Sequence, residues 1–261
     1  MVVYVFGINF LQEAEVVISL FQNAPAFTIE TGVNTWLMYA AAFTLLSSSI
    51  IALSKDNLKA RLAYSTISQL AYIVLGAAIA TEAAIMGAGL HIAMHAVGKI
   101  TLFFCAGAVY VALHKKKISE MHGIGRKMPF TMGAFFLGSL CIIGVPPMGG
   151  SWSKWYLAVG AIDAEQMIFV IVLMISSLLS IAYLMPVVVK AFFYEPQPDD
   201  HHDHHDDHHA PANDKGGFFG QLQEAPIFCV APLCLTAAGC IAMFFGAPFV
   251  YDLIESITKV G

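Results

Sequence analysis

Three titratable side chains recur at a spacing of four residues within one apolar stretch. His91, His95 and Lys99 are the histidines and the lysine of segment 83–113, which contains no other residue that is cationic when protonated. Residues four apart lie on one face of a helix, about 6 Å apart along its axis. Histidine titrates near neutral pH, and a lysine kept from water can exchange its proton. The spacing therefore predicts a ladder that relays protons. The alternative is that the histidines bond to neighbouring helices while Lys99 extends to the membrane surface.

Another lysine, Lys154, follows a segment that cannot continue as a helix. Pro146 and Pro147 remove two backbone donors and clash with the preceding turn, and Gly149 and Gly150 come directly after them. In membrane proteins such breaks line cavities, and they expose helix ends that bind or steer ions. A break followed within two turns by a lysine predicts an ion-handling site.

Polar residues also run along segment 59–69. Lys59 and Arg61 stand at one end, where a long side chain can reach the membrane surface. Ser65, Ser68 and Gln69 continue inward. This stripe is compatible with helix packing or with a water path.

A different kind of cluster occupies segment 199–209, which contains six histidines and five aspartates. Imidazole and carboxylate groups would bind zinc, nickel or copper weakly, but no fixed spacing orders them. We expect a solvated loop with incidental metal affinity, and specific metal handling is the alternative. The candidate ligands are His201, His202, His204, His205, His208 and His209.

The composition shows where these residues must lie. The chain has 261 residues, of which 12% are charged and 58% are apolar, and its mean hydropathy is +0.71. A soluble domain carries about twice that share of charge. The composition therefore excludes a soluble enzyme, a disordered linker and a nucleic-acid binder. It predicts a polytopic membrane protein.

Six stretches are long and apolar enough to cross a bilayer as helices. They are 33–54, 62–80, 83–113, 130–158 (the broken one), 167–193 and 226–251. A seventh, 1–21, is interrupted by polar residues and is expected to be a partial span. The predicted fold is an all-α membrane bundle of about six full transmembrane helices plus a partial N-terminal one. We expect four parts. Residues 1–32 form the end of a membrane helix and an interfacial connection, and residues 33–193 form the main bundle. A His/Asp-rich loop, 194–225, is followed by a closing helix with its tail, 226–261.

The basic residues alternate between the two sides of this bundle. Ten of the thirteen lie in the three connections on one side, and the connections on the other side have none. By the positive-inside rule, the basic side is cytoplasmic. We therefore expect a multi-pass protein of the cell (inner) membrane, with the His/Asp-rich loop in the cytoplasm.

Three segments together resemble the antiporter-like membrane subunits of Mrp-type cation/proton antiporters, respiratory complex I and membrane-bound hydrogenases. They are DNLKARLAYSTISQLAYIVLG, HIAMHAVGKITLFFCAGAV and GVPPMGGSWSKW, in the family's order. The SWSKW of the last segment is more similar to the D-type member of the Mrp antiporters. The resemblance implies that His95 and Lys99 are a proton-relay pair and that Lys154 exchanges protons with one side. It implies no role for His91.

The same resemblance gives weaker implications for two further residues and for the extent of the chain. Lys59 matches a basic residue of a loop and is a candidate for coupling, whereas Gln69 stands where some members have histidine. The family's complete subunit has about fourteen helices in two inverted five-helix repeats. Residues 33–193 match the second repeat, so we expect a fragment or a split subunit.

The expected function is that of an ion-translocating subunit, which moves protons alone or in exchange for Na⁺. It would work within an Mrp-type antiporter or a complex-I-like NADH-quinone oxidoreductase, beside other membrane subunits in the lipid bilayer. No redox cofactor motif is present, so we expect no cofactor in this chain and any electron transfer in partner subunits. Two alternatives are a divalent metal exporter that uses the His-rich loop and a non-pumping structural subunit of a membrane arm.

Overall fold

The structure, a computed structural model, describes residues 33–195 and 224–258. The partial span expected within 1–32 and the histidines of segment 199–209 lie outside the described residues. The described helices are α2 (Val33–Ser54), α3 (Leu58–Ile79), α4 (Glu82–Leu113), α5 (Ile124–Lys127), α6 (Pro129–Ile143), α7 (Gly150–Asp163), α8 (Met167–Phe193), α9 (Ile227–Phe245) and α10 (Ala247–Thr258), with a 3-10 turn η1 (Ile118–Glu120).

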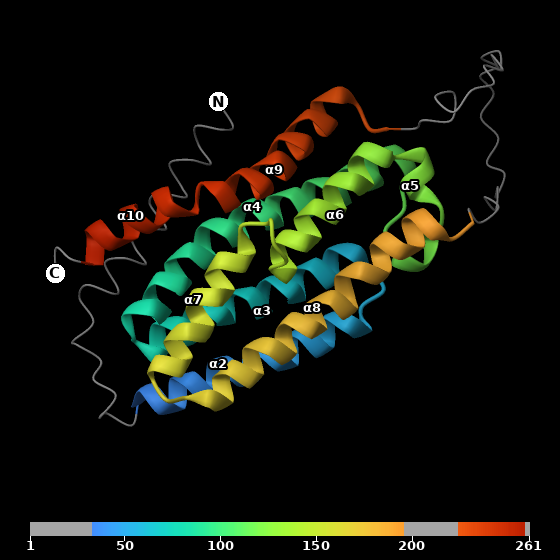
Figure 1. Cartoon of the computed structure of the whole chain (residues 1–261). Helices are drawn as coiled ribbons and strands as arrows, with labels where there is room; N and C mark the ends of the chain where they lie inside the picture. The colour runs from blue at the N-terminus through green and yellow to red at the C-terminus, as the bar shows by residue number, and fades with distance from the viewer. Residues whose placement is uncertain (1–32, 196–223, 259–261) are drawn as a thin grey trace, which may run out of the picture.

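The helices form an elongated bundle around α4 (Figure 1), which packs against α3, α6, α7, α9 and α10. Helices α2 and α8 cover the side beyond α3, and α9 lies along the opposite side. Among the described helices, five are long and apolar enough to span a membrane: α2, α3, α4, α8 and α9. Helices α6 and α7 are the two halves of the broken span. The predicted polytopic helical bundle is confirmed.

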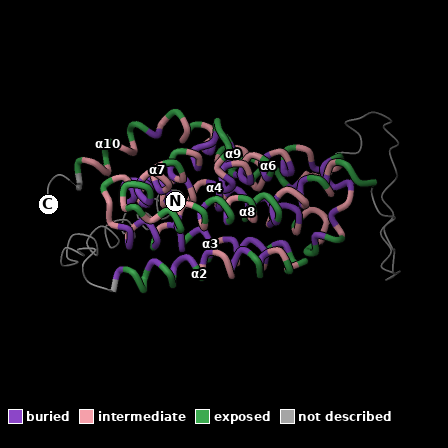
Figure 2. The backbone as a smooth tube through the Cα atoms, turned by 60° about the horizontal axis from the view of Figure 1, so that its bottom comes forward, coloured by how far each residue is buried: buried purple, intermediate pink, exposed green. Residues whose placement is uncertain are grey.

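The bundle has the polarity expected of a protein in lipid. Large apolar side chains such as Trp36, Phe43 and Phe228 are at least 74% exposed, whereas Lys99 and Gln69 are buried. Figure 2 shows the exposed positions along the outward faces of the helices and the buried ones facing inward. A stable membrane helix can turn apolar side chains outward because lipid tails are as apolar as leucine. The protein therefore keeps its polar groups for contacts between helices.

Two helix boundaries differ from the sequence prediction. Helix α3 begins at Leu58 rather than at residue 62, because the side chain of Asn57 accepts a hydrogen bond from Ala60 N at 3.2 Å and caps the helix. The predicted last span, 226–251, is divided at Gly246 into α9 and α10. Pro248 follows this position and lacks a backbone donor, so the helix cannot continue regularly.

The three basic connections meet at one end of the bundle. Leu58 N donates to Lys116 O at 3.0 Å, and Gly123 N donates to Lys190 O at 3.1 Å. The carboxylate of Asp56 accepts hydrogen bonds from Ser119 N and Ser119 Oγ at 3.0 and 2.7 Å. These bonds hold the pKa of Asp56 below its usual value. The connections thus form one hydrogen-bonded layer, and its cytoplasmic orientation remains a prediction.

Candidate functional site

The three residues of the predicted ladder lie along one face of the uninterrupted helix α4. The rings of His91 and His95 stack, with their centroids 6.0 Å apart and their planes 9° apart. Lys99, one turn further, is 5% exposed. The predicted alignment of His91, His95 and Lys99 is confirmed by the structure of α4.

Lys99 is turned into the bundle rather than toward a membrane surface. Its Nζ donates to Ser65 Oγ at 2.6 Å and to Leu62 O at 3.2 Å, both on α3. Ser65 Oγ is in turn 2.8 Å from the hydroxyl of Tyr183 on α8. The alternative of an extended Lys99 is therefore wrong. The polar stripe of α3 serves packing at Ser68, which bonds to Ser49, and holds the lysine at Ser65.

The predicted break is also present, because α6 ends at Ile143 and α7 begins at Gly150. Pro146 and Pro147 lie exposed in the connection between them, whereas Gly149 and Gly150 are buried. A Cβ at Gly149 would lie 2.5 Å from Met94 Sδ, and one at Gly150 would overlap the carbonyl oxygen of Cys141. The two glycines therefore allow α7 to start close against α4 and α6.

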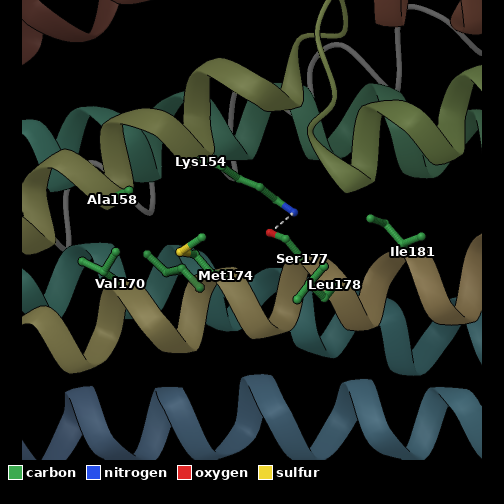
Figure 3. A pocket seen from close by; sticks show the side chains of 8 residues that line it. Lys154, Ala158, Val170, Met174, Ser177, Leu178 and Ile181 are labelled. Carbon is green, nitrogen blue, oxygen red and sulfur yellow. Dashed lines mark hydrogen bonds between the residues drawn. The ribbon is translucent and has the colours of Figure 1, made fainter.

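The break supplies the acceptor for Lys154. Its Nζ donates to Ile143 O at 2.9 Å. It also donates to Ser177 Oγ on α8 at 3.1 Å (Figure 3). Ile143 is the last residue of α6, where carbonyls lack partners within the helix and the helix dipole is negative. Gly144 follows with φ +86°, and a Cβ there would lie 2.9 Å from Lys154 Cδ. Glycine thus permits both the turn and the passage of the lysine stem.

Lys154 also borders a pocket of about 290 Å³ between α7 and α8 (Figure 3). The lining residues are Lys154, Ala158, Val170, Leu173, Met174, Ser177, Leu178 and Ile181. Apart from Lys154 and Ser177, the lining side chains are apolar. The ammonium group is therefore the polar end of an otherwise apolar recess.

A serine connects the ladder to the helix that carries Lys154. Ser153 Oγ lies 2.9 Å from His91 Nδ1 and donates to Gly150 O at 3.0 Å. Since a hydroxyl has one proton, this arrangement makes His91 Nδ1 the donor to Ser153. His91 Nε2 then carries a lone pair. The His91 end of the ladder is thereby bonded to Ser153, the residue directly before Lys154.

Several buried polar atoms near the ladder have no hydrogen-bond partner among the described residues. They include His91 Nε2, His95 Nε2 and both side-chain polar atoms of Gln69. Leaving one such group unpaired costs about 1–3 kcal/mol. The space between the two lysines therefore contains hydrogen-bonding capacity that the described residues do not satisfy.

The other sequence candidates lie apart from this arrangement. Lys59 is exposed, with its Nζ 5.1 Å from the centre of the Tyr110 ring, at the basic end of the bundle. Arg61, expected at the membrane surface, is buried and donates to Tyr183 O at 3.0 Å. Within the described ranges, no three His, Cys, Asp or Glu side chains gather as a metal-binding group.

Ser177 and Tyr183 contribute to the site, although the sequence did not single them out. Their signal was a series of polar residues in the most apolar of the long helices, α8, at positions 176, 177, 180 and 183. Polar groups placed in such a helix face the bundle interior.

Comparisons with known proteins show which family the chain belongs to. Residues 12–180 match the family described as "NADH:quinone oxidoreductase/Mrp antiporter, TM", and the chain belongs to this family. It is thus a multi-pass membrane protein of the Mrp and complex I type.

The relatives include subunits of NADH-quinone oxidoreductases and of an Na(+)/H(+) antiporter. The chain is 44% identical over 163 residues to the N subunit of the NADH-quinone oxidoreductase of Desulforudis audaxviator, covering 62% of this chain and 32% of the relative. It is 31% identical over 176 residues to the D subunit of the Na(+)/H(+) antiporter of Alkalihalophilus pseudofirmus, covering 67% and 35%. The chain thus spans about a third of the length of these relatives, and the lean toward the D-type member stays a prediction.

Solved structures show the same fold at low sequence identity. The Mrp complex from Dietzia sp. DQ12-45-1b matches with a TM-score of 0.74 at 20% identity, covering 86% of this chain and 46% of that one. Respiratory complex I from Thermus thermophilus with bound NADH matches with a TM-score of 0.68 at 18% identity, covering 87% and 44%. At this identity, the likeness concerns the fold alone.

Proposed function

We propose that the chain is an ion-translocating membrane subunit that transfers protons between Lys99 and Lys154 through His95 and His91. The observation that carries this proposal is a pair of lysines inside the bundle, each held by neutral acceptors and joined by a histidine ladder. These residue types can all take up and release protons.

The neutral acceptors matter because a permanent charge is costly inside a membrane protein. A buried ammonium is normally offset by a carboxylate. Within the part of the chain that the structure describes, the one ion pair closer than 4.0 Å joins Lys117 and Glu120, far from either lysine. Lys99 and Lys154 are therefore suited to alternate between charged and neutral forms.

Water is the natural carrier across the gaps of this path. The unpaired Nε2 atoms of His91 and His95 and the amide of Gln69 offer both acceptors and donors. A water molecule needs two to four such partners. A proton leaving Lys99 would pass by water to His95 and then to His91. From His91, which is bonded to Ser153, it would pass to Lys154. Exchange with one side of the membrane would occur at Lys154, because it borders the pocket.

The relatives support a place for the chain within a larger assembly. Their names include subunits of NADH-quinone oxidoreductases and a Na(+)/H(+) antiporter, and the matched structures include an Mrp complex and complex I. We therefore place the chain beside other membrane subunits of such a complex, in the cell (inner) membrane. Proton movement would there be coupled to Na⁺ or to electron transfer in a partner.

Substitution of His95 tests the proposal. In vesicles containing the whole complex, His95→Gln should lower proton uptake at least tenfold, because proton relay by a positioned side chain is commonly worth about a hundredfold or more. The control is His122→Gln, which changes a histidine that stacks on Tyr194 at the basic end. It should transport normally. Normal uptake by an assembled His95→Gln complex would contradict the relay.

A further inference from the structure

Tyr72 of α3 contacts both His91, the ladder residue farthest from Lys99, and Lys154. Its side chain is fully buried. The Nζ of Lys154 lies over its ring, 5.0 Å from the centroid, and the ring of His91 stacks on it at 5.2 Å. One aromatic ring therefore contacts both a residue of the ladder and the lysine beyond the break.

The hydroxyl of Tyr72 fixes the ring against α8. It donates to Leu173 O at 3.4 Å and lies 3.5 Å from Ser177 Oγ. Ser177 Oγ also accepts from Lys154 Nζ. The ring and the serine thus bound the ammonium group from two helices, while Ile143 O of α6 bonds it from a third.

We infer that Tyr72 is a positioning residue for Lys154, and this inference rests on the proposed function. The negative face of the aromatic ring attracts the ammonium group and holds it against the ring on which His91 also stacks. Such an attraction is strongest where water is excluded, as it is for this buried ring. When Lys154 is neutral the attraction disappears, so the ring favours the charged form in the position next to the ladder.

Fluorination separates this role from packing, because fluorine withdraws charge from the ring face and changes its size little. Position 72 is replaced in turn by phenylalanine and by its mono-, di- and trifluoro analogues. Proton uptake is then measured in vesicles containing the whole complex. Tyr72→Phe should keep most of the activity, and uptake should fall stepwise with each fluorine, by roughly tenfold across the series. Tyr72→Leu should fall at least as far.

The matched control is Phe135, another buried ring, over which no described lysine or arginine lies. The same analogues at position 135 should leave uptake unchanged. A flat response at position 72, or an equal decline at position 135, would overturn the inference. Lys154→Ala is measured in parallel. If it is inactive while the Tyr72 series is flat, only the role of Tyr72 is wrong, whereas a fully active Lys154→Ala refutes the proposed function and this inference together.

Discussion

Lys99 and Lys154 are both held inside the bundle by one hydroxyl and one carbonyl, but the carbonyls differ in kind. Lys99 bonds to Leu62 O within the continuous helix α3, where Thr66 Oγ1 also donates to that carbonyl. Lys154 bonds to Ile143 O, at the end of α6, where the helix dipole adds to the attraction. An intact helix therefore offers a lysine a shared acceptor, whereas a broken helix offers an unshared one.

The surroundings of the two lysines also differ. Lys99 is 5% exposed and bonded toward α3, whereas Lys154 lines a pocket of about 290 Å³. We infer that Lys99 passes protons within the bundle and that Lys154 exchanges them with one side. The break matters because the carbonyl at the end of α6 stabilises the charge of the lysine that borders the pocket.

A large effect is expected from neutralising the inner lysine, Lys99. Lys99→Met keeps the length and apolar stem of the side chain but removes the exchangeable proton, so proton uptake by the whole complex should fall below a tenth of normal. Lys117→Met removes a lysine whose side chain is 63% exposed, and uptake should remain normal. Substantial uptake by an assembled Lys99→Met complex would show that the two lysines are not parts of one path.

A glycine substitution should disturb the site at the break without changing a charge. Gly144→Ala places a Cβ at φ +86° and 2.9 Å from Lys154 Cδ. The backbone strain is about 1–2 kcal/mol, and displacement of the lysine should reduce uptake several-fold. Both thermal unfolding and proton uptake are measured.

The control for Gly144 is Gly133, a glycine within α6. A Cβ at Gly133 would meet nothing within 4 Å, so Gly133→Ala should keep normal uptake and raise helix stability by up to about 1 kcal/mol. Equal behaviour of the two variants would mean that the space around the Lys154 stem is not critical.

The smallest effect is expected when two buried serines are compared: Ser65, which bonds to Lys99, and Ser139, which has no partner among the described residues. Ser65→Ala removes the 2.6 Å partner of Lys99, and hydrogen bonds to charged groups contribute about 1.5–3 kcal/mol. Ser139 Oγ of α6 is equally buried but has no partner among the described residues. Ser65→Ala should therefore lower the unfolding temperature and reduce uptake a few-fold, whereas Ser139→Ala should be neutral or stabilising. The reverse order would contradict the assigned partners.

Much of the fold could be predicted because it depends on local features. The bounds of α2 and α8 coincide with the apolar runs 33–54 and 167–193, and the break follows from Pro146 and Pro147. The start of α3 was misplaced because the Asn57 cap extends a helix beyond its apolar residues. The division at Gly246 was missed because residues 226–251 remain apolar throughout.

The site could be predicted only where one helix determines it. The spacing of His91, His95 and Lys99 is a property of α4 alone, so it could be deduced from periodicity. The partners Ser65, Ser177 and Ile143 O come from three other helices, and no sequence spacing specifies how those helices pack. The inward turn of Arg61 was missed for the same reason.

The central claim is that Lys154 transfers protons rather than serving as a fixed charge, and a series of substitutions tests it directly. Proton uptake is measured in vesicles containing the whole complex, with assembly checked in parallel. Lys154→Ala should abolish uptake. Lys154→Glu should retain part of it, because a carboxylate can also exchange protons, whereas Lys154→Arg should be inactive, because guanidinium does not release its proton in proteins. Uptake by Lys154→Arg at the wild-type rate would show that Lys154 is a fixed charge and that the proposed relay is wrong.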